Sequence, residues 1–191
     1  TFAFLLLQLE RQQRWLEGLA AEDALTGIHN RRAFFERAQR RLSRRDGDGL
    51  LALLMIDADS FKAINDRHGH AVGDRVLVSV AAAMHESLQP GDIAGRFGGD
   101  EFCMLLMGVS TGEAARRAQL LRRTVAARPL RIDGIDVPVT LSIGIAHMRE
   151  GRDADLDRLL AIADRRLYLA KRTGRDRVID HDVELDLPAQ A

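Results

Sequence analysis

Hydrophobic and polar positions recur along this chain with two different periods, which together predict where helices and strands lie. Residues 50–56 form an unbroken apolar run that ends at Asp57, a pattern typical of a central strand buried on both faces. A polar helical segment is expected after this strand, up to a turn at residues 67–69. Apolar residues three and four positions apart predict helices over residues 30–45, 74–88, 111–127 and 156–172. Shorter apolar stretches predict strands over residues 93–97, 101–107, 137–147 and 177–179.

Gly98, Gly99 and Asp100 separate two of these strands, and a two-glycine turn between strands is a signal for a β-hairpin. The elements then follow the order β-α-α-β-β-α-β-α-β. This order predicts a single α/β (α+β) domain in which helices flank a central mixed sheet.

The first 22 residues have a pattern of their own. Six residues recur at alternating steps of four and three: Phe2, Leu6, Leu9, Gln13, Leu16 and Ala20. This heptad spacing suits a coiled coil between two chains, but an amphipathic helix that packs on its own domain fits it equally, and both interpretations remain open.

The two ends of the chain differ in pattern from the predicted domain between them. The chain begins with Thr1, so we expect it to be a fragment. Residues 2–7 are apolar but too few to cross a bilayer, although they would suit the cytoplasmic end of a membrane helix. Residues 181–191 are expected to form an acidic, frayed tail.

Composition narrows the function classes. The formal net charge is zero, which argues against a protein that binds nucleic acid through a bulk positive field. A single cysteine, Cys103, excludes a disulfide scaffold and a multi-cysteine metal site, and fits a reducing compartment. All but two of the 28 basic residues are arginines, and the exceptions are Lys62 and Lys171.

Acidic residues gather at two places that the predicted sheet would bring together. Asp57 ends the buried strand, and Asp100 lies at the tip of the predicted hairpin. If the hairpin lies beside that strand, the two carboxylates repel each other unless a cation or a proton sits between them. Mg²⁺ prefers such carboxylates together with waters and substrate phosphates, and the hairpin glycines leave room for a phosphate to approach the backbone. Lys62 would supply a compact positive charge for a polyphosphate.

The chain resembles the GGDEF family of diguanylate cyclases, and four stretches carry the resemblance in the expected order. Residues 96–102 read RFGGDEF and match the family's signature, and residues 23–32 resemble its opening motif. Residues 57–66, followed by residues 69–70 and 73–74, match the middle motif, and Lys171 with residues 174–175 matches the closing one. The resemblance implies a catalytic domain over residues 23–180 with a nucleotidyl-cyclase-like, ferredoxin-type fold, preceded by a signalling helix over residues 1–22.

The resemblance also implies roles for individual residues. Asp57 and Asp100 would bind Mg²⁺ (or Mn²⁺) through their carboxylates and Ala58 through its carbonyl, while Glu101 would bind a second metal or help to deprotonate the attacking hydroxyl. The remaining residues would bind GTP. Asn65 and Asp74 would contact the guanine edge, and Phe61 and His70 would line the same pocket. Gly98 and Gly99 would lie beside the phosphates, and the β- and γ-phosphates would be held by Lys62, Lys171 and Arg175. Asp100, Glu101 and Lys62 are the candidate catalytic residues.

The implied reaction joins two GTP molecules into cyclic di-GMP and releases two pyrophosphates. One domain offers one guanine pocket, so turnover would need a homodimer, and a coiled coil would link it to an upstream sensor. We expect a cytoplasmic domain, in a full-length protein that would be membrane-anchored if the apolar start belongs to a membrane helix. The alternatives are a catalytically silent receptor or scaffold, which the intact acidic motif disfavours, and a mixed cyclic GMP-AMP synthase, which Asp74 disfavours.

One stretch departs from the family's pattern. Many members carry an Arg-x-x-Asp site that binds the product and inhibits the enzyme, whereas this chain has Gln89 and Asp92 at those positions. A glutamine lacks the charged fork that a phosphate prefers, so we expect weak or no product inhibition through this degenerate site.

Overall fold

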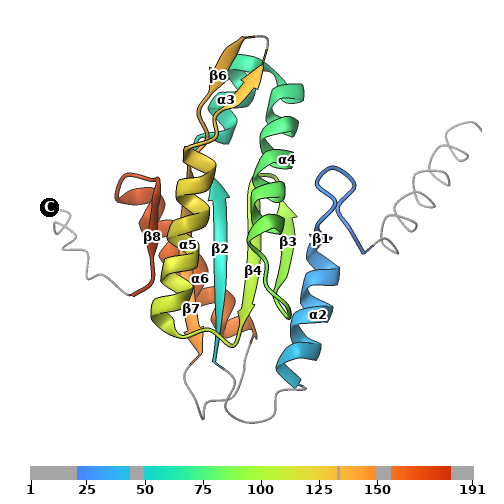
Figure 1. The fold of residues 1–191 in the computed structure, drawn as a ribbon, viewed down its shortest axis with the longest axis vertical. Coiled ribbons are helices and arrows are strands. Elements are labelled where there is room, and N and C mark those ends of the chain that lie inside the picture. Colours follow the sequence, from blue (N-terminus) through green and yellow to red (C-terminus); the bar gives the residue numbers. More distant parts are fainter. Residues whose placement is uncertain (1–20, 44–49, 133, 149–155, 182–191) are drawn as a thin grey trace, which may run out of the picture.

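The computed structural model describes residues 21–43, 50–132, 134–148 and 156–181, and these residues form a central sheet between two layers of helices (Figure 1). The predicted N-terminal helix falls almost entirely on residues 1–20, and the predicted acidic tail on residues 182–191, which lie outside the described residues.

The sheet has six strands in the order β1-β3-β4-β2-β7-β8. Their bounds are His29–Asn30 (β1), Leu51–Ala58 (β2), Ile93–Gly98 (β3), Glu101–Met107 (β4), Leu141–Met148 (β7) and Arg177–Ile179 (β8). The four central strands are antiparallel, and β1 and β8 each pair in parallel at an edge. The predicted mixed sheet is therefore confirmed, and β2 is buried at every position, as its apolar run predicts.

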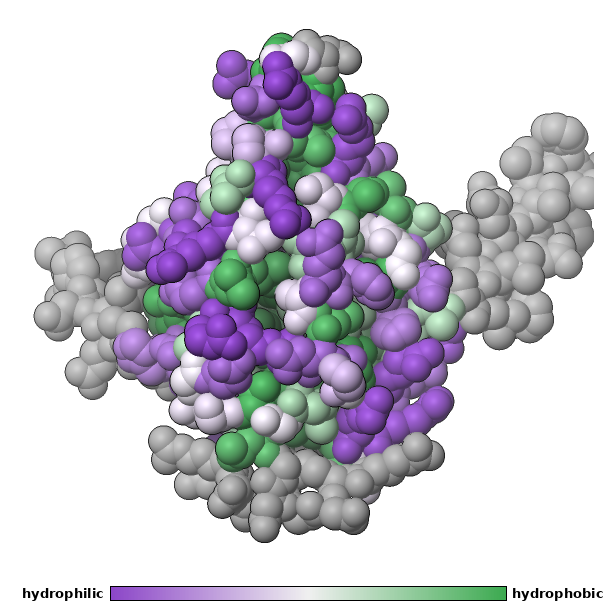
Figure 2. Space-filling view, in the orientation of Figure 1, coloured by the Kyte–Doolittle hydropathy of each residue, from purple (hydrophilic) through white to green (hydrophobic). Residues whose placement is uncertain are grey.

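Two helices cover each face of the sheet. The helices α4 (His70–Ser87) and α5 (Thr111–Ala126) pack on one face, while α2 (Arg31–Ser43) and α6 (Leu156–Arg172) pack on the other. Successive side chains of β2 alternate between the two cores, because neighbouring residues of a strand point to opposite faces. The outer side of α4 and α5 shows only small, separate hydrophobic patches among hydrophilic residues, so their apolar stripes are used against the sheet (Figure 2).

Gly144 allows α6 to approach the sheet closely. A Cβ at this position of β7 would lie 2.1 Å from the carbonyl oxygen of Ala163 and 2.2 Å from the amide nitrogen of Leu167, both in α6. Only glycine fits between the strand and the helix backbone at this spacing. The close contact also fixes where the end of α6, with Lys171, meets the sheet.

Two of the predicted boundaries are wrong. The helix expected from Asp74 already begins at His70, because Gly69, at φ +85°, turns the chain within a single residue after α3 (Phe61–His68). The strand expected over residues 137–147 is split after Val137, since Pro138 follows and has no N–H to donate. Val137 instead ends β6 (Ile135–Val137), which pairs with β5 (Leu130–Ile132) in a two-stranded hairpin that the sequence pattern does not predict. In the part of the chain that the structure describes, no helix is long and apolar enough to span a bilayer.

Candidate active site

The β3–β4 hairpin lies directly beside the end of β2, as the sequence predicts. Asp57 is in register with Glu101 across the two strands, and the Ala58 amide donates a hydrogen bond to the carbonyl oxygen of Asp100 at 3.2 Å. Two acidic segments that are distant in the sequence therefore meet at one edge of the sheet.

Asp57 carries an unfavourable negative charge in this position. Asp57 is only 4% exposed. Burial raises the pKa of its carboxyl to about 6, and the negative charges of Asp100 and Asp59 also raise it. Lys171 opposes this shift, because its Nζ lies 2.6 Å from the Asp57 carboxylate. One ammonium group does not offset the burial and the two neighbouring carboxylates, so the site favours additional positive charge.

The tip of the hairpin is open above the two glycines. Gly98 and Gly99 have φ values of +150° and +52°, and a Cβ at either position would meet no atom of the described part of the chain within 4 Å. A ligand could therefore approach the backbone here without displacing a side chain.

Arg96 fixes the shape of this tip, a role that its place in the signature does not reveal. Its Nε and Nη2 donate to the carbonyl oxygen of Gly99 at 3.1 and 2.8 Å, and its Nη1 donates to Asp23 at 3.0 Å. Burial raises the pKa of the Asp23 carboxyl, but hydrogen bonds from Thr26 and Arg96 outweigh this effect and leave the pKa below its usual value. Asp23 is thus a stable anion that joins the opening motif to the hairpin.

The residues expected at the guanine edge lie on α3 and α4. Asn65 of α3 packs so closely against Gly73 of α4 that a Cβ on the glycine would lie 1.9 Å from the Asn65 Oδ1, and 3.1 Å from the ring of Phe61. The Oδ1 of Asn65 is buried and has no hydrogen-bond partner among the residues that the structure describes. His70 and Asp74 are exposed, one turn apart on α4, so these residues line the α3–α4 region but do not pair with one another.

Of the three cationic residues expected on the phosphates, the structure brings only one to the carboxylates. Lys171 contacts Asp57, whereas Lys62 on α3 and Arg175 after α6 are exposed. Within the described residues, no ion pair joins these two to Asp57 or Asp100. Both remain available to an anionic ligand.

The acidic edge fits a divalent cation only in part. Among the described residues, no group of three or more His, Cys, Asp or Glu side chains is placed to hold a metal ion. Two carboxylates and a backbone carbonyl are nevertheless the donors that Mg²⁺ uses when a nucleotide completes its coordination. The unfavourable charge on Asp57 agrees with a cation bound together with substrate phosphates.

Asp59 belongs to the same motif but has a different environment. It is 5% exposed, and its carboxylate accepts hydrogen bonds from Thr140, Ser142 and the backbone of Asp176. The sequence predicts no role for Asp59, and its two signals are its place in the middle motif and its position just beyond the end of a buried strand.

The degenerate product site is already occupied by protein groups. The Asp92 side chain is 1% exposed, forms an ion pair with Arg117 of α5 at 2.5 Å, and accepts hydrogen bonds from the backbone amides of Gln89 and Met107. Asp92 therefore ties the turn before β3 to α5 and to the end of β4.

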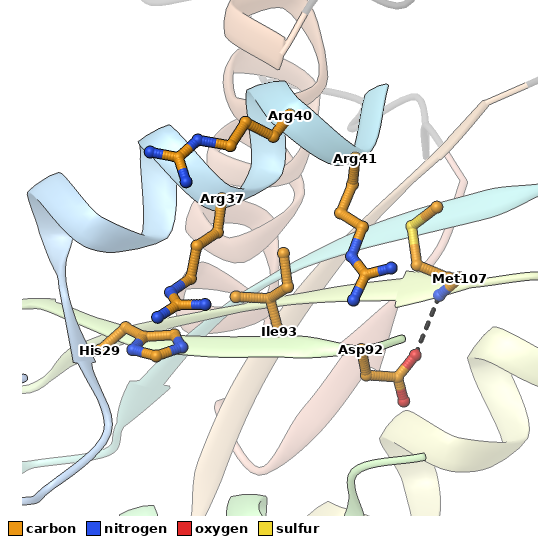
Figure 3. Close-up of a pocket in the computed structure, with 7 residues that line it drawn as sticks. All are labelled: His29, Arg37, Arg40, Arg41, Asp92, Ile93 and Met107. Carbon is orange, nitrogen blue, oxygen red and sulfur yellow. Dashed lines mark hydrogen bonds between the residues drawn. The ribbon is translucent and has the colours of Figure 1, made fainter. Parts of the chain in front are cut away.

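A cationic cavity of about 430 Å³ opens beside Asp92. Its lining residues are His29, Arg37, Arg40, Arg41, Asp92, Ile93 and Met107. Arg37 reaches from α2 toward His29 and Arg41 toward Asp92, while Arg40 points away along the helix (Figure 3). Burial, and then the charge of Arg37, lower the pKa of His29, so the arginines carry the positive charge of this cavity.

Comparisons with known proteins agree with this geometry. Residues 20–177 match the family model described as "Diguanylate cyclase, GGDEF domain". The chain is 41% identical over 160 residues to diguanylate cyclase DgcP of Pseudomonas aeruginosa, covering 83% of this chain and 24% of that protein. It is 40% identical over 158 residues to diguanylate cyclase DosC of Escherichia coli, covering 82% of this chain and 34% of that protein. The chain thus spans only about a quarter to a third of the length of these relatives.

A solved structure shows the same fold. The coiled coil and GGDEF domain of DgcB from Caulobacter crescentus, in complex with c-di-GMP, superposes with a TM-score of 0.77 at 29% identity, covering 94% of this chain and 97% of that one.

Proposed function

The chain belongs to the GGDEF family of diguanylate cyclases, and we propose that it condenses two GTP molecules into cyclic di-GMP and releases two pyrophosphates. The observation that carries the proposal is the meeting of Asp57 with the glycine-rich hairpin that bears Asp100 and Glu101. In this reaction the 3′-hydroxyl of each ribose attacks the α-phosphate of the opposite nucleotide. The protein contributes position and charge rather than covalent chemistry.

The acidic edge would bind the metal. Asp57, Asp100 and the carbonyl of Ala58 would hold Mg²⁺, for which Mn²⁺ could substitute, and Glu101 would bind a second ion or accept the proton of the attacking hydroxyl. When bound, such an ion neutralises the triphosphate and makes the attacking hydroxyl more acidic. The raised pKa of Asp57 supports this assignment, because the carboxylate gains most from added positive charge.

The α3–α4 region would bind the guanine. Asn65 and Asp74 would pair with its polar edge, and Phe61 and His70 would line the same pocket. The unpartnered Oδ1 of Asn65 supports this role, since a buried acceptor favours a ligand that donates to it. Adenine lacks the ring N–H donor that guanine would offer to Asp74, which favours a guanine substrate over a mixed guanine–adenine reaction.

Three cations would hold the phosphates. Lys62 and Arg175 would bind the β- and γ-phosphates from exposed positions, and Lys171 would exchange its contact with Asp57 for one with phosphate. Gly98 and Gly99 would let these phosphates approach the hairpin backbone.

Turnover would need two such domains. The product has two-fold symmetry, and each domain offers one guanine site, so we propose a homodimer whose two sites face each other. The predicted N-terminal helix would then control how often the loaded cytoplasmic domains meet and would connect them to an upstream sensor. Removal of residues 1–20 should therefore change how turnover depends on protein concentration, and an unaltered dependence contradicts this role.

The test of the proposed function is incubation with Mg²⁺ and GTP, with and without ATP, followed by chromatography of the products. We expect cyclic di-GMP from the unaltered chain and none from Asp100→Ala or Glu101→Ala. Unconsumed GTP would favour a silent receptor or scaffold, and a guanine–adenine product would favour a mixed synthase.

Product inhibition should be weak at the degenerate site, because Asp92 is already paired and Gln89 carries no charge. Tight binding of cyclic di-GMP that disappears in Asp92→Ala would contradict this expectation.

A further inference from the structure

The turn between α6 and β8 (residues 173–176, the α6–β8 turn) contains two consecutive residues with an unusual backbone. Arg175 has φ +59° and Asp176 has φ +44°, which is the left-handed region that favours glycine. Each such residue costs about 1–2 kcal/mol, so this conformation persists only where surrounding groups impose it. Contacts with neighbouring residues must therefore hold these two residues in the left-handed conformation.

Asp59 supplies one of these constraints from beneath the turn. Its Oδ2 accepts a hydrogen bond from the backbone amide of Asp176 at 2.9 Å. The same carboxylate is anchored to the start of β7, because it also accepts from the Thr140 hydroxyl at 2.8 Å and the Ser142 hydroxyl at 2.6 Å. Its own amide donates to the carbonyl oxygen of Thr140 at 2.9 Å. A buried, fully bonded carboxylate thus ties the turn to the sheet.

Two further contacts complete the constraint. Arg122 of α5 forms an ion pair with the Asp176 side chain at 2.6 Å. The Arg175 amide donates to the carbonyl oxygen of Ala170 at 3.0 Å, which closes the end of α6. The turn is therefore held from the sheet, from α5 and from its own helix, and its exposed Arg175 side chain starts from a fixed backbone position.

We propose that Asp59 is a positioning residue for phosphate binding, which holds the α6–β8 turn in the strained conformation that presents Arg175 to the triphosphate. The inference rests on the proposed function, because the turn can position Arg175 for phosphate binding only if Arg175 binds the phosphates of GTP. Asp59 is the residue directly after β2. Residues 57–59 would therefore fix the position of the Asp57 carboxylate and, through the α6–β8 turn, that of Arg175.

The experiment is a double-mutant cycle on GTP turnover with the full chain and Mg²⁺. Asp59→Asn keeps the size of the side chain but removes its charge and replaces one acceptor oxygen with a donor, which weakens the three hydrogen bonds that the carboxylate accepts. We expect it to raise the KM for GTP about tenfold with kcat within about threefold. In an Arg175→Ala background, Asp59→Asn should raise KM less than twofold, because the turn then presents nothing to the phosphates.

A second variant tests the same turn without disturbing a buried group. Arg122→Met removes the ion pair to Asp176 at the partly exposed side of the turn, and we expect a rise in KM of about threefold. Arg123→Met is its matched control, since Arg123 is the next residue of α5, is exposed and loses the same charge.

The outcomes separate the inference from the proposed function. An unaltered chain that leaves GTP unconsumed overturns the proposed function. If the unaltered chain turns over GTP, two results overturn the positioning role alone. The first is an unchanged KM in both Asp59→Asn and Arg122→Met. The second is an effect of Asp59→Asn on KM that is just as large in the Arg175→Ala background.

Discussion

Replacement of Asp57 by asparagine should stabilise the metal-free protein. The side chain keeps its size, but the charge that the site disfavours is removed. Because the carboxyl pKa is raised to about 6 from an ordinary value of 3.8, the folded protein holds its proton over a range in which the unfolded chain has already released it. The free energy of unfolding of the unaltered protein therefore falls as pH rises from about 4 to about 6, and the full penalty remains at higher pH.

The size of the gain follows from the same shift. Each pKa unit is worth about 1.4 kcal/mol, so a shift of about two units corresponds to about 3 kcal/mol. This value is the upper limit of the gain in the free energy of unfolding. Water reaches the hairpin tip and the Lys171 side chain, which is 33% exposed, so screening reduces the effect. We expect Asp57→Asn to raise the free energy of unfolding by about 1–2 kcal/mol at pH 8.

The assay is urea unfolding in the presence of EDTA at pH 8 and at pH 4. The gain should be present at pH 8 and should be largely lost at pH 4, where the folded carboxyl keeps its proton and the unfolded one is only partly ionised. Asp136→Asn, on the exposed strand β6, is the control and should change stability by less than about 0.5 kcal/mol. A loss of stability in Asp57→Asn at pH 8 would refute the reasoning, because it would mean that the ion pair with Lys171 outweighs burial and repulsion.

Three further predictions concern packing and the site. Gly144→Ala should cost about 3 kcal/mol or more in urea unfolding, because its Cβ would overlap the backbone of α6, whereas Gly112→Ala, with open space around it, should be neutral or stabilising. Lys62→Arg should lower turnover if the triphosphate needs a compact charge, and unchanged turnover would dismiss that idea. Arg96→Met should reduce turnover at least tenfold by releasing the Gly99 carbonyl, while Arg128→Met, on the exposed surface, should not.

Much of this fold is predictable from local pattern because burial leaves a clear trace in the sequence. The unbroken apolar run of β2 predicts a strand covered on both faces, and the two glycines before Asp100 predict a hairpin. That this hairpin pairs with β2, so that Asp57 meets Asp100, is a condition that local pattern leaves open and that the structure supplies. Element boundaries are harder where one residue decides them, as Gly69 does for the start of α4 and Pro138 for the end of β6.

Long-range partners leave no such trace. The ion pair between Lys171 and Asp57, and the bond from Asp176 to Asp59, each join residues more than 100 positions apart. The pairing of Asp92 with Arg117 likewise depends on how α5 packs beside the end of α4, since Arg117 also donates to the Ser87 carbonyl oxygen. Sequence motifs identify which polar groups are present, but the packing of helices on the sheet decides which of them meet.

The two aspartates of the Asp57-Ala58-Asp59 stretch show how the domain reconciles chemistry with stability. Asp57 faces an acidic hairpin with one ammonium group for compensation, whereas Asp59 has three donors around a buried carboxylate. Removal of charge at the first position relieves repulsion, but at the second it breaks a satisfied set of hydrogen bonds, which costs about 1–3 kcal/mol. Urea unfolding at pH 8 should therefore show opposite signs for Asp57→Asn and Asp59→Asn, and a shared sign would show that one environment governs both residues.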